Sequence, residues 1–514
     1  MEEREPTAGH GHTSELAAII RGMSVALLGS VLGGGLGFVY AVAMARLVSQ
    51  HEFGLLILAV NLLTAGAAVT VAGADYAAIR HVAAARTPGA KRGAMITPIR
   101  LVMTLNICVA ATVAVFAGPI SRDLLAQPDF TPILLAATLV LPLTVLAQMF
   151  SACLSGLEHA RGELVRKVVE QGGRIALGVL TLSLGFGLVA ATLGMAGAAA
   201  AAAVAVGYVL WRALPRGGTT DTTGTSARVV FAFAWPQAVA NVATQLWVVA
   251  AVVILSRSTD ARTVGLFGAA FAISQLPLLV YNAFTYRFSP AIARLWDRGE
   301  NQALDELLKS ITRWVAIFAV PLYAIAIALP GPLLQIFGPE YRPAASALAI
   351  MTVATLLNAL AGPVERALIM TGRVKLEMGT NVVATVLVIG IAVVLTPRYG
   401  LVGAAVSVLI YTLVRNVAKT YFLFRTIHMT ALSRSLLRPL VAATVASGVV
   451  AAIAQLTSLG HSLLGTAALG ILLIALYALI LLRFIGVSNT DRQTLLLAFR
   501  PSAAAAKLPD PTAG

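Results

Sequence analysis

The stretch from Leu329 to Leu413 decides the fold: LPGPLLQIFGPEYRPAASALAIMTVATLLNALAGPVERALIMTGRVKLEMGTNVVATVLVIGIAVVLTPRYGLVGAAVSVLIYTL. Three apolar runs are separated by short polar joints. The first joint, FGPEYRP at 337–343, holds two prolines and a glycine, which end one helix and start the next within a few residues. The others are the basic TGRVK at 371–375 and the turn PRYG at 397–400. Runs of roughly 20 to 28 residues cross about 30 Å of hydrocarbon as helices, so the stretch predicts membrane spans.

The composition of the whole chain excludes an ordinary soluble protein. The 514 residues are 58% hydrophobic and 11% charged with a mean hydropathy of +0.86, whereas soluble proteins carry about 25% charged residues. The net charge of +15 would suit nucleic acid only if the basic residues gathered on one solvated face, and here they are scattered through short loops. Two cysteines within apolar runs, and the lone pair His10 and His12, are too few for a metal site. No cofactor and no metal are predicted.

The hydropathy pattern predicts an all-α polytopic membrane protein of about fourteen transmembrane helices. The polar ends, 1–18 and 485–514, are expected to be cytosolic tails. The predicted helices are 19–46, 53–78, 94–118, 131–155, 168–188, 192–212, 229–255, 263–287, 312–337, 344–370, 376–396, 401–424, 436–457 and 462–484.

The distribution of basic residues predicts that both termini are cytosolic. With the N-terminus inside, only six of the 37 Lys and Arg residues fall in predicted outer loops. Because cytosolic loops of membrane proteins carry the excess of Lys and Arg, this bias supports a multi-pass protein of the cytoplasmic membrane with both ends inside. The six are Arg46, Arg122, Arg257, Arg262, Arg342 and Arg398.

An internal repeat divides the chain into two related halves. ARLVSQHEFGLL at 45–56 and SRSTDARTVGLF at 256–267 both place an arginine eight residues before a glycine, at an offset of 211. GMAGAA at 194–199 recurs as GLVGAA at 400–405. Each pair is separated by six predicted helices, so the halves share one orientation and can be related by an axis along the membrane normal.

The predicted domains follow from this repeat. We expect two six-helix lobes facing a central cavity, with two further helices at the end. The segments are an N-lobe at 19–215, a linker at 216–228, a C-lobe at 229–425 and the last helices at 436–484. The linker is rich in Gly, Ser and Thr, which disfavours a helix there.

The joints FGPEY, TGR and PRYG, in this order and spacing, resemble the C-terminal half of the polysaccharide transporter family. This is the O-antigen flippase type within the multidrug and oligosaccharidyl-lipid exporter superfamily. RLVSQHEFGLLILA at 46–59 resembles the first outer loop and second helix of that family, and VGLFGAAFAISQLPLLVYNAFTYRFSPAIARLWDRGE at 264–300 resembles its eighth helix and the following segment. The resemblance covers nearly the whole chain.

The resemblance implies a flippase for a lipid-linked oligosaccharide on undecaprenyl pyrophosphate, serving cell-surface polysaccharides such as the O-antigen of lipopolysaccharide. It implies a cavity lined by the first, second, seventh and eighth helices. Expected partners are membrane lipids and polymerase or assembly proteins, and not nucleic acid. Many members carry an aspartate late in the seventh helix, where this chain reads QLWVVAAVVILS at 245–256. That departure puts in doubt any coupling scheme that needs an acid there.

Polar residues within apolar helices are candidates for the cavity wall, because a polar side chain in lipid is costly. Gln237, Asn241 and Gln245 form one stripe of the seventh helix. The other candidates are Asn61 in the second helix and Gln275, Asn282 and Tyr286 in the eighth. The alternative is that these amides hydrogen-bond helix to helix, which contributes only about 0.6 to 2 kcal/mol.

Arginines within spanning helices are candidates for a pyrophosphate, because a guanidinium donates two parallel hydrogen bonds to phosphate. Arg21 and Arg287 are favoured, since both lie on expected lining helices without a nearby acid, and Arg80 and Arg174 follow. Asp75 and Glu170 are competing partners for the last two. Arg100, Arg366 and Arg415 are weaker candidates.

Two other functions stay open. A drug or organic-cation antiporter of the same superfamily needs intramembrane carboxylates, for which Asp75, Glu170 and Glu365 qualify. A polytopic enzyme needs acid, base or metal ligands at a water-accessible site, and the predicted outer loops are short and poor in such residues. The sequence therefore predicts a transporter and not an enzyme. Segment 291–313 further predicts an amphipathic helix at the membrane surface.

Overall fold

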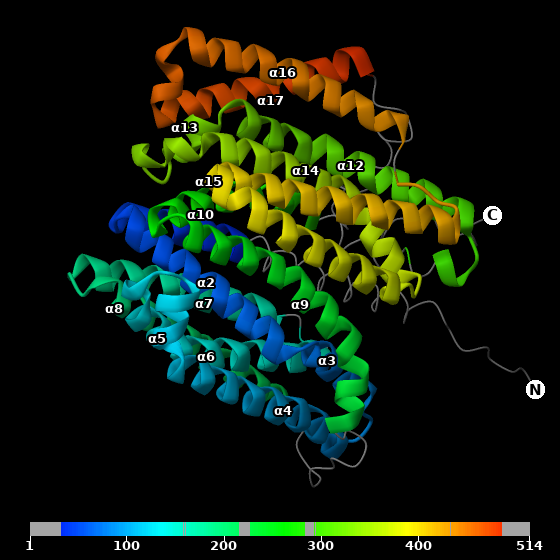
Figure 1. The fold of residues 1–514 in the computed structure, drawn as a ribbon. Helices are drawn as coiled ribbons and strands as arrows, with labels where there is room; N and C mark the ends of the chain where they lie inside the picture. The colour runs from blue at the N-terminus through cyan, green and yellow to red at the C-terminus, as the bar shows by residue number, and fades with distance from the viewer. Residues whose placement is uncertain are drawn as a thin grey trace, which may run out of the picture.

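The computed structural model describes residues 32–157, 159, 161–214, 227–282, 292, 295–431 and 433–485. Within these segments the regular structure is helical throughout, which confirms the predicted all-α membrane fold (Figure 1). A helix at Leu32–Leu47 comes first. The longer helices that follow are α2 (Gln50–Val71), α3 (Ala74–Ala84), α4 (Pro88–Val115), α6 (Thr131–Gly156), α7 (Arg161–Ser183), α8 (Gly187–Ala213), α9 (Ala227–Ser258), α10 (Ala261–Gln275), α12 (Asn301–Ala328), α14 (Ala345–Met370), α15 (Val374–Ile427), α16 (Leu437–Leu456) and α17 (Leu463–Ile485).

Short helical turns fill several of the joints between these helices. They are α5 (Ala117–Pro119), η1 (Ile120–Leu124), η2 (Pro128–Phe130), α13 (Pro330–Leu334), η3 (Pro339–Ala344), η4 (Arg434–Leu436) and η5 (Ser458–His461). The joint FGPEYRP forms η3, as its prolines predict.

Ten helices of the described residues are long and apolar enough to span a membrane, so the predicted count of fourteen is not confirmed. Every predicted span has a helical counterpart, but several differ in length or charge. Helix α10 has 15 residues, and α7 is rich in charged side chains. The 54-residue α15 contains two predicted spans, divided at Gly400, whose φ of 54° breaks the helix at the PRYG turn.

Two helix boundaries differ from the prediction. The second predicted helix is broken at Ala72 and Gly73, which both have positive φ and separate α2 from α3. The predicted surface helix at 291–313 is wrong, because its second half is the start of the long α12. Its apolar side chains Leu304, Leu308 and Ile311 are buried in a core cluster and do not face lipid.

The helices form two bundles joined along one end of the molecule (Figure 1). Helices α2, α3, α4, α6, α7 and α8 pack together, while α12, α14 and α15 form a second bundle that α16 and α17 extend beside α12. Helix α9 packs along α15 and also contacts α2 and α3. One core cluster holds residues of both bundles, among them Phe53 and Phe337. The other large clusters each draw most of their residues from a single bundle.

The bundles meet where α2 crosses α10 with backbone against backbone. A Cβ on Gly54 would lie 1.7 Å from the carbonyl oxygen of Ala261, and one on Gly265 would lie 2.7 Å from that of Gln50. Gly54 and Gly265 are related by the repeat offset of 211, and so are Gln50 and Ala261, so each half makes the same contact with the other. Such reciprocity is the property of an interface on a two-fold axis.

Polar and aromatic contacts seal the bundles at this end, which we call the seam. Arg46 donates hydrogen bonds from Nε to the Ile336 carbonyl at 2.8 Å and from Nη2 to the Gln335 carbonyl at 2.5 Å. The Phe53 ring stands edge-on to Tyr341 at 5.8 Å and near Phe337 at 6.1 Å. The first arginine of the repeat therefore caps carbonyls of the opposite bundle.

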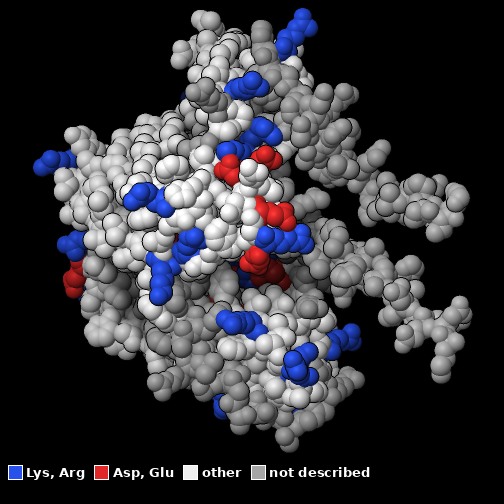
Figure 2. Space-filling model, turned by 90° about the vertical axis from the view of Figure 1, so that its right-hand side faces the viewer, with Lys and Arg blue, Asp and Glu red and all other residues white. Residues whose placement is uncertain are grey.

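Basic side chains are scattered over the face opposite the seam (Figure 2). Lys and Arg are spread across this face, while Asp and Glu gather near its middle. It is the right-hand side of the molecule in Figure 1. The scatter is that of loops at a membrane surface and unlike the continuous basic stripe of a nucleic-acid site.

The predicted orientation is tested by single cysteines at Ala84 and Arg342, two exposed positions at opposite ends of the fold. Cys108 and Cys153, both free thiols, are first replaced by serine. A membrane-impermeant thiol reagent applied to intact cells should label the cysteine at 342 and not that at 84, since only the former is predicted to be outside. Equal labelling in intact cells, with both sites reactive after lysis, contradicts the orientation.

Candidate functional site

A polar cavity of ≈ 280 Å³ lies between α2, α3, α6 and α9. From α9 it receives Asn241, Thr244 and Gln245, and from α3 and α6 it receives Asp75 and Gln148. Two residues of the predicted amide stripe therefore face a cavity. For the third, Gln237, the structure describes the backbone alone, within α9.

A second cavity of ≈ 210 Å³ adjoins the first. Both are lined by Thr64, Ala67 and Gln148, so we treat them as one N-lobe cavity. The second part is bounded by α7 and α8 and brings in Glu170 and Arg174. The N-lobe cavity thus combines amides, hydroxyls, two carboxylates and a guanidinium in an otherwise apolar protein.

The break between α2 and α3 shapes the wall of this cavity. Val71 and Gly73 line it on either side of the break, and Asp75 follows in the first turn of α3. A broken helix leaves backbone groups without intrahelical partners, and at membrane depth such backbone is tolerated only beside protein or water. The break is therefore a polar feature of the wall.

A ladder of ion pairs on α7 supplies the charge of the second part. Arg174 Nη2 lies 2.6 Å from Glu170 Oε1, and Arg166 Nη1 lies 3.0 Å from the other oxygen of Glu170. Arg166 also pairs with Glu163 at 2.7 Å, and Lys167 lies 3.4 Å from the same Glu163 oxygen. Glu170 thus has two cationic partners, of which only Arg174 lines the cavity.

Arg174 keeps unused hydrogen-bonding capacity. Its side chain is 14% exposed, and its buried Nε has no hydrogen-bond partner among the described residues. A buried donor without a partner costs about 1 to 3 kcal/mol, so a site of this kind favours an acceptor that arrives with a ligand. The Tyr40 hydroxyl is another buried group without a partner in the described part of the chain.

Asp75 forms the acidic side of the cavity. Gln148 Nε2 donates to Asp75 Oδ2 at 3.3 Å, and the backbone N–H of Tyr76 donates to Oδ1 at 3.0 Å. The Asp75 carboxylate and the Gln148 amide are therefore joined by a hydrogen bond in the cavity wall.

The other predicted site residues lie elsewhere. Asn61 donates to the Ile57 carbonyl of its own helix at 2.8 Å and does not line the N-lobe cavity. Gln275 ends α10, just before the helix breaks at Pro277, and Asn282 lies beyond that break. Arg80 is exposed near the end of α3. Arg21, Tyr286 and Arg287 lie outside the described residues.

The sequence analysis missed four lining residues and most of the ladder. Thr64, Thr144, Gln148 and Thr244 all line the N-lobe cavity. Gln148 had a visible signal, because it is a lone amide in the apolar run TVLAQMFSACL at 144–154. The threonines gave none, because a hydroxyl within a helix can return its hydrogen bond to its own backbone, as Thr64 does to Val60.

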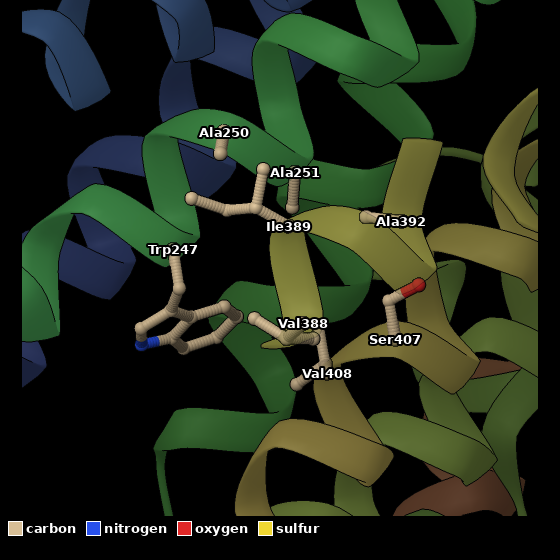
Figure 3. A pocket seen from close by; sticks show the side chains of 8 residues that line it. All are labelled: Trp247, Ala250, Ala251, Val388, Ile389, Ala392, Ser407 and Val408. Atoms are coloured by element: carbon tan, nitrogen blue, oxygen red, sulfur yellow. The ribbon is translucent and has the colours of Figure 1, made fainter. Parts of the chain in front are cut away.

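An apolar crevice between α9 and α15 is a different kind of site (Figure 3). Trp247, Ala250 and Ala251 from α9 face Val388, Ile389, Ala392 and Val408 from α15, with Ser407 at one side. The crevice has no space for a water molecule. It is the tight contact that holds α9 against α15.

Three solved structures with a similar fold are a flippase and two MATE transporters. The lipid II flippase MurJ in an inward closed conformation is 15% identical with a TM-score of 0.70, covering 90% of this chain and 98% of that one. An inward-facing multidrug resistance MATE family transporter is 17% identical with a TM-score of 0.65, covering 80% and 98%. An outward-facing MATE structure is 16% identical with a TM-score of 0.59, covering 79% and 95%. At these identities the likeness shows the fold.

The fold is that of the lipid II flippase MurJ and of a MATE family transporter of the MOP superfamily. The sequence model of the polysaccharide biosynthesis protein family matches residues 19–296, more than half of the chain, and the MatE model matches 236–394. The chain belongs to the polysaccharide biosynthesis protein family. No curated protein matched the chain in a sequence search.

The ladder predicts a specific loss of stability. Arg166→Ala removes one of the two cationic partners of both Glu163 and Glu170. Because this part of the ladder is largely buried, the free energy of unfolding should fall by about 3 to 5 kcal/mol. Arg298→Ala removes an exposed pair at 3.8 Å from Glu300 and should cost less than about 1 kcal/mol. Thermal unfolding of the two purified variants in one detergent measures the difference. Equal melting temperatures would show that the ladder does not stabilise the fold.

Proposed function

We propose that the protein is a flippase that moves a lipid-linked oligosaccharide of the undecaprenyl-pyrophosphate type across the cytoplasmic membrane by alternating access. The family match and the flippase fold support this function, and the arginine in the N-lobe cavity carries the argument. The glycan would serve a cell-surface polysaccharide such as the O-antigen of lipopolysaccharide. Membrane lipids and polysaccharide polymerase or assembly proteins are the proposed partners, and both termini are proposed to be cytosolic.

Partner exchange at Glu170 allows the cavity to accept an anion. A phosphate group can accept two parallel hydrogen bonds from the guanidinium of Arg174, whose Nη2 then no longer contacts Glu170. Glu170 still holds Arg166 at 3.0 Å, so the exchange leaves no carboxylate bare in the membrane. Asn241, Gln245 and Gln148 offer amides to sugar hydroxyls on the other wall.

The size of the cavity fits the head group better than the whole saccharide. The two parts, ≈ 280 and ≈ 210 Å³, are each smaller than the range of about 300 to 1,000 Å³ for ligand pockets. A saccharide therefore requires the two bundles to separate further on the side away from the seam. The lipid tail stays in the bilayer, so only the polar head needs the cavity.

One observation favours the alternative function, export of an organic cation. Asp75 lines the same cavity, and a carboxylate there could bind a cation and exchange it for a proton. The charges around the cavity do not decide between the functions. Asp75, Glu170 and Arg174 line it with a net charge of −1, and the neighbouring Glu163, Arg166 and Lys167 of the ladder bring the total to zero.

Arg174→Ala should lower glycan export about tenfold to hundredfold in a flippase-deficient cell, because a hydrogen bond to a charged group contributes about 1.5 to 3 kcal/mol. Arg174→Lys keeps the charge but loses the fork, so it should retain intermediate export. Arg212→Ala is the control, an exposed arginine on α8 that lies over the Tyr208 ring. Membrane abundance is measured in parallel. Full export by Arg174→Ala at normal abundance refutes the role of Arg174.

Asp75→Asn separates the two functions. A flippase with an anionic substrate should keep export, or gain it, when a negative charge leaves the cavity, whereas a cation antiporter should lose drug resistance. Glycan export and resistance to organic cations are measured for the same variant. Lost resistance with no glycan export by the parent protein would replace the flippase by the antiporter.

Arg21 and Arg287 remain proposed contributors to pyrophosphate binding. We expect Arg21→Ala and Arg287→Ala to abolish export while the protein still inserts, and Arg287→Lys to retain part of it. The same export assay tests them, and full export by both alanine variants would leave Arg174 and the α9 amides as the head-group site.

A further inference from the structure

A second charged site is buried in the other bundle, apart from the N-lobe cavity. Lys419 Nζ donates to Glu365 Oε2 at 2.9 Å and to Glu377 Oε1 at 2.7 Å, and Lys419 is 1% exposed. Arg415 Nη2 lies 3.8 Å from Glu365 and also donates to Asn358 Oδ1. These four charged residues, which we call the C-lobe cluster, come from α14 and from both halves of α15.

The C-lobe cluster is not fully satisfied by its own hydrogen bonds. Glu377 Oε2, Asn381 Oδ1, Arg415 Nε and Asn416 Nδ2 have no hydrogen-bond partner in the described part of the chain. These four residues are 3 to 8% exposed. Charges at membrane depth are costly and mark ion or proton sites more often than they stabilise a fold. A bare carboxylate oxygen next to unsatisfied amides is a place for a proton.

Hydrogen bonds connect Glu377 to the wall of the N-lobe cavity. Asn381 Nδ2 donates to Glu377 Oε1 at 2.9 Å and lies 3.5 Å from Thr244 Oγ1, which lines that cavity. One turn further along α15, Thr385 donates to the Ala243 carbonyl of α9 at 2.9 Å. A change in the protonation of Glu377 can therefore affect α9 through a single side chain, that of Asn381.

An aromatic contact gives the same link a second path. Arg415 lies over the Tyr411 ring at 5.4 Å, and Tyr411 stacks on Trp247 of α9 at 4.6 Å. Trp247 also ends the dry crevice between α9 and α15 (Figure 3). A change in the C-lobe cluster thus alters the surroundings of one tryptophan on the helix that carries Asn241 and Gln245.

We propose that the C-lobe cluster is a proton-binding site, with Glu377 as the acceptor, whose protonation shifts α9 and thereby couples a proton to transport. The coupling rests on the proposed transport function, whereas the proton site itself does not. The proton adds to Glu377 Oε2, and the cluster changes from a net charge of zero to +1. Lys419 then keeps its ion pair with Glu365, and Glu377 no longer accepts the hydrogen bond of Asn381 as a charged carboxylate.

The surrounding charges favour Glu377 over Glu365 as the acceptor. Glu365 contacts Lys419 and Arg415 and is also under the influence of Arg366 on α14. Glu377 forms an ion pair with Lys419 alone, is under the influence of Arg415 at longer range, and lies near the negative charge of Glu365. Tyr411 is the remaining titratable group of the described residues at the cluster, and α9 contributes only the uncharged Thr244 and Trp247.

Lys419 also distinguishes a proton from a metal cation. Its ammonium lies between the two carboxylates and takes up the space between them. Because the Lys419 ammonium already neutralises the two carboxylates, a dissolved cation is not required there. We therefore expect the C-lobe cluster to respond to pH and not to sodium.

The fluorescence of Trp247 tests this proposal without any substrate. The purified full-length protein is titrated between about pH 5 and 9 in potassium chloride, and the Trp247→Phe variant is subtracted to remove the other four tryptophans. We expect a titration from Trp247 that Glu377→Gln abolishes and that the control Glu306→Gln, an exposed acid on α12, leaves unchanged. No titration, or the same titration in Glu377→Gln, overturns the proposal.

Lys419→Met tests the role of the attached cation. Losing the ammonium should raise the midpoint by at least about one pH unit, a tenfold tighter proton, and should make the signal depend on sodium, which the parent protein ignores. A parent signal that changes when sodium replaces potassium overturns the proposal. If Lys419→Met does not elute as a folded protein, the Glu377→Gln comparison decides. Because neither readout involves a glycan, failure here is distinct from failure of the flippase function.

Discussion

The structure depends on the cost of charge in a medium that cannot solvate it. The chain has only 11% charged residues, and the buried charged side chains of its described residues belong to two networks in which they pair with opposite charges. The network on α7 borders a cavity, so an anion can replace one of its members. The C-lobe cluster is closed, and a proton is the ligand that needs least space there. The same constraint therefore underlies the two ligands that we propose, an anion in one bundle and a proton in the other.

The two networks occupy corresponding places in the repeat. Glu170 stands 24 residues before the glycine of GMAGAA and Glu377 stands 23 residues before that of GLVGAA. Each bonds a side chain one turn further on, Arg174 in the first half and Asn381 in the second. Each half thus has an acid near the same point of the repeat, one residue out of register, and one turn later the first half has a cation facing the cavity and the second has an amide facing α9.

Most of the fold could be read from the sequence because apolar length and proline-glycine joints are local signals. The break at Ala72 could not, since no proline marks it and an alanine with positive φ is not expected. The surface helix was misjudged because an amphipathic pattern does not say whether lipid or protein covers its apolar face. Leu304 and Leu308 meet protein.

Part of the candidate site could also be predicted from the sequence, for a similar reason. The cost of amides in lipid correctly placed Asn241 and Gln245 on a cavity wall, and the spacing of Glu170 and Arg174 predicted their ion pair. Asn61 followed the same rule but satisfies its amide within its own helix. The ion pair of Glu377 and Lys419 could not be predicted, because its two residues are 42 apart in the sequence and such pairing appears only when helices are placed beside one another.

The glycine crossing at the seam has a consequence for how such a chain can evolve. Each glycine makes room for a backbone carbonyl of the other half, so the space at Gly54 is filled by Ala261 and that at Gly265 by Gln50. A side chain gained in either copy meets main chain, which no second mutation can shorten. The charged networks of the two halves can therefore change independently, whereas at this crossing neither glycine can gain a side chain unless the backbone of the other half moves.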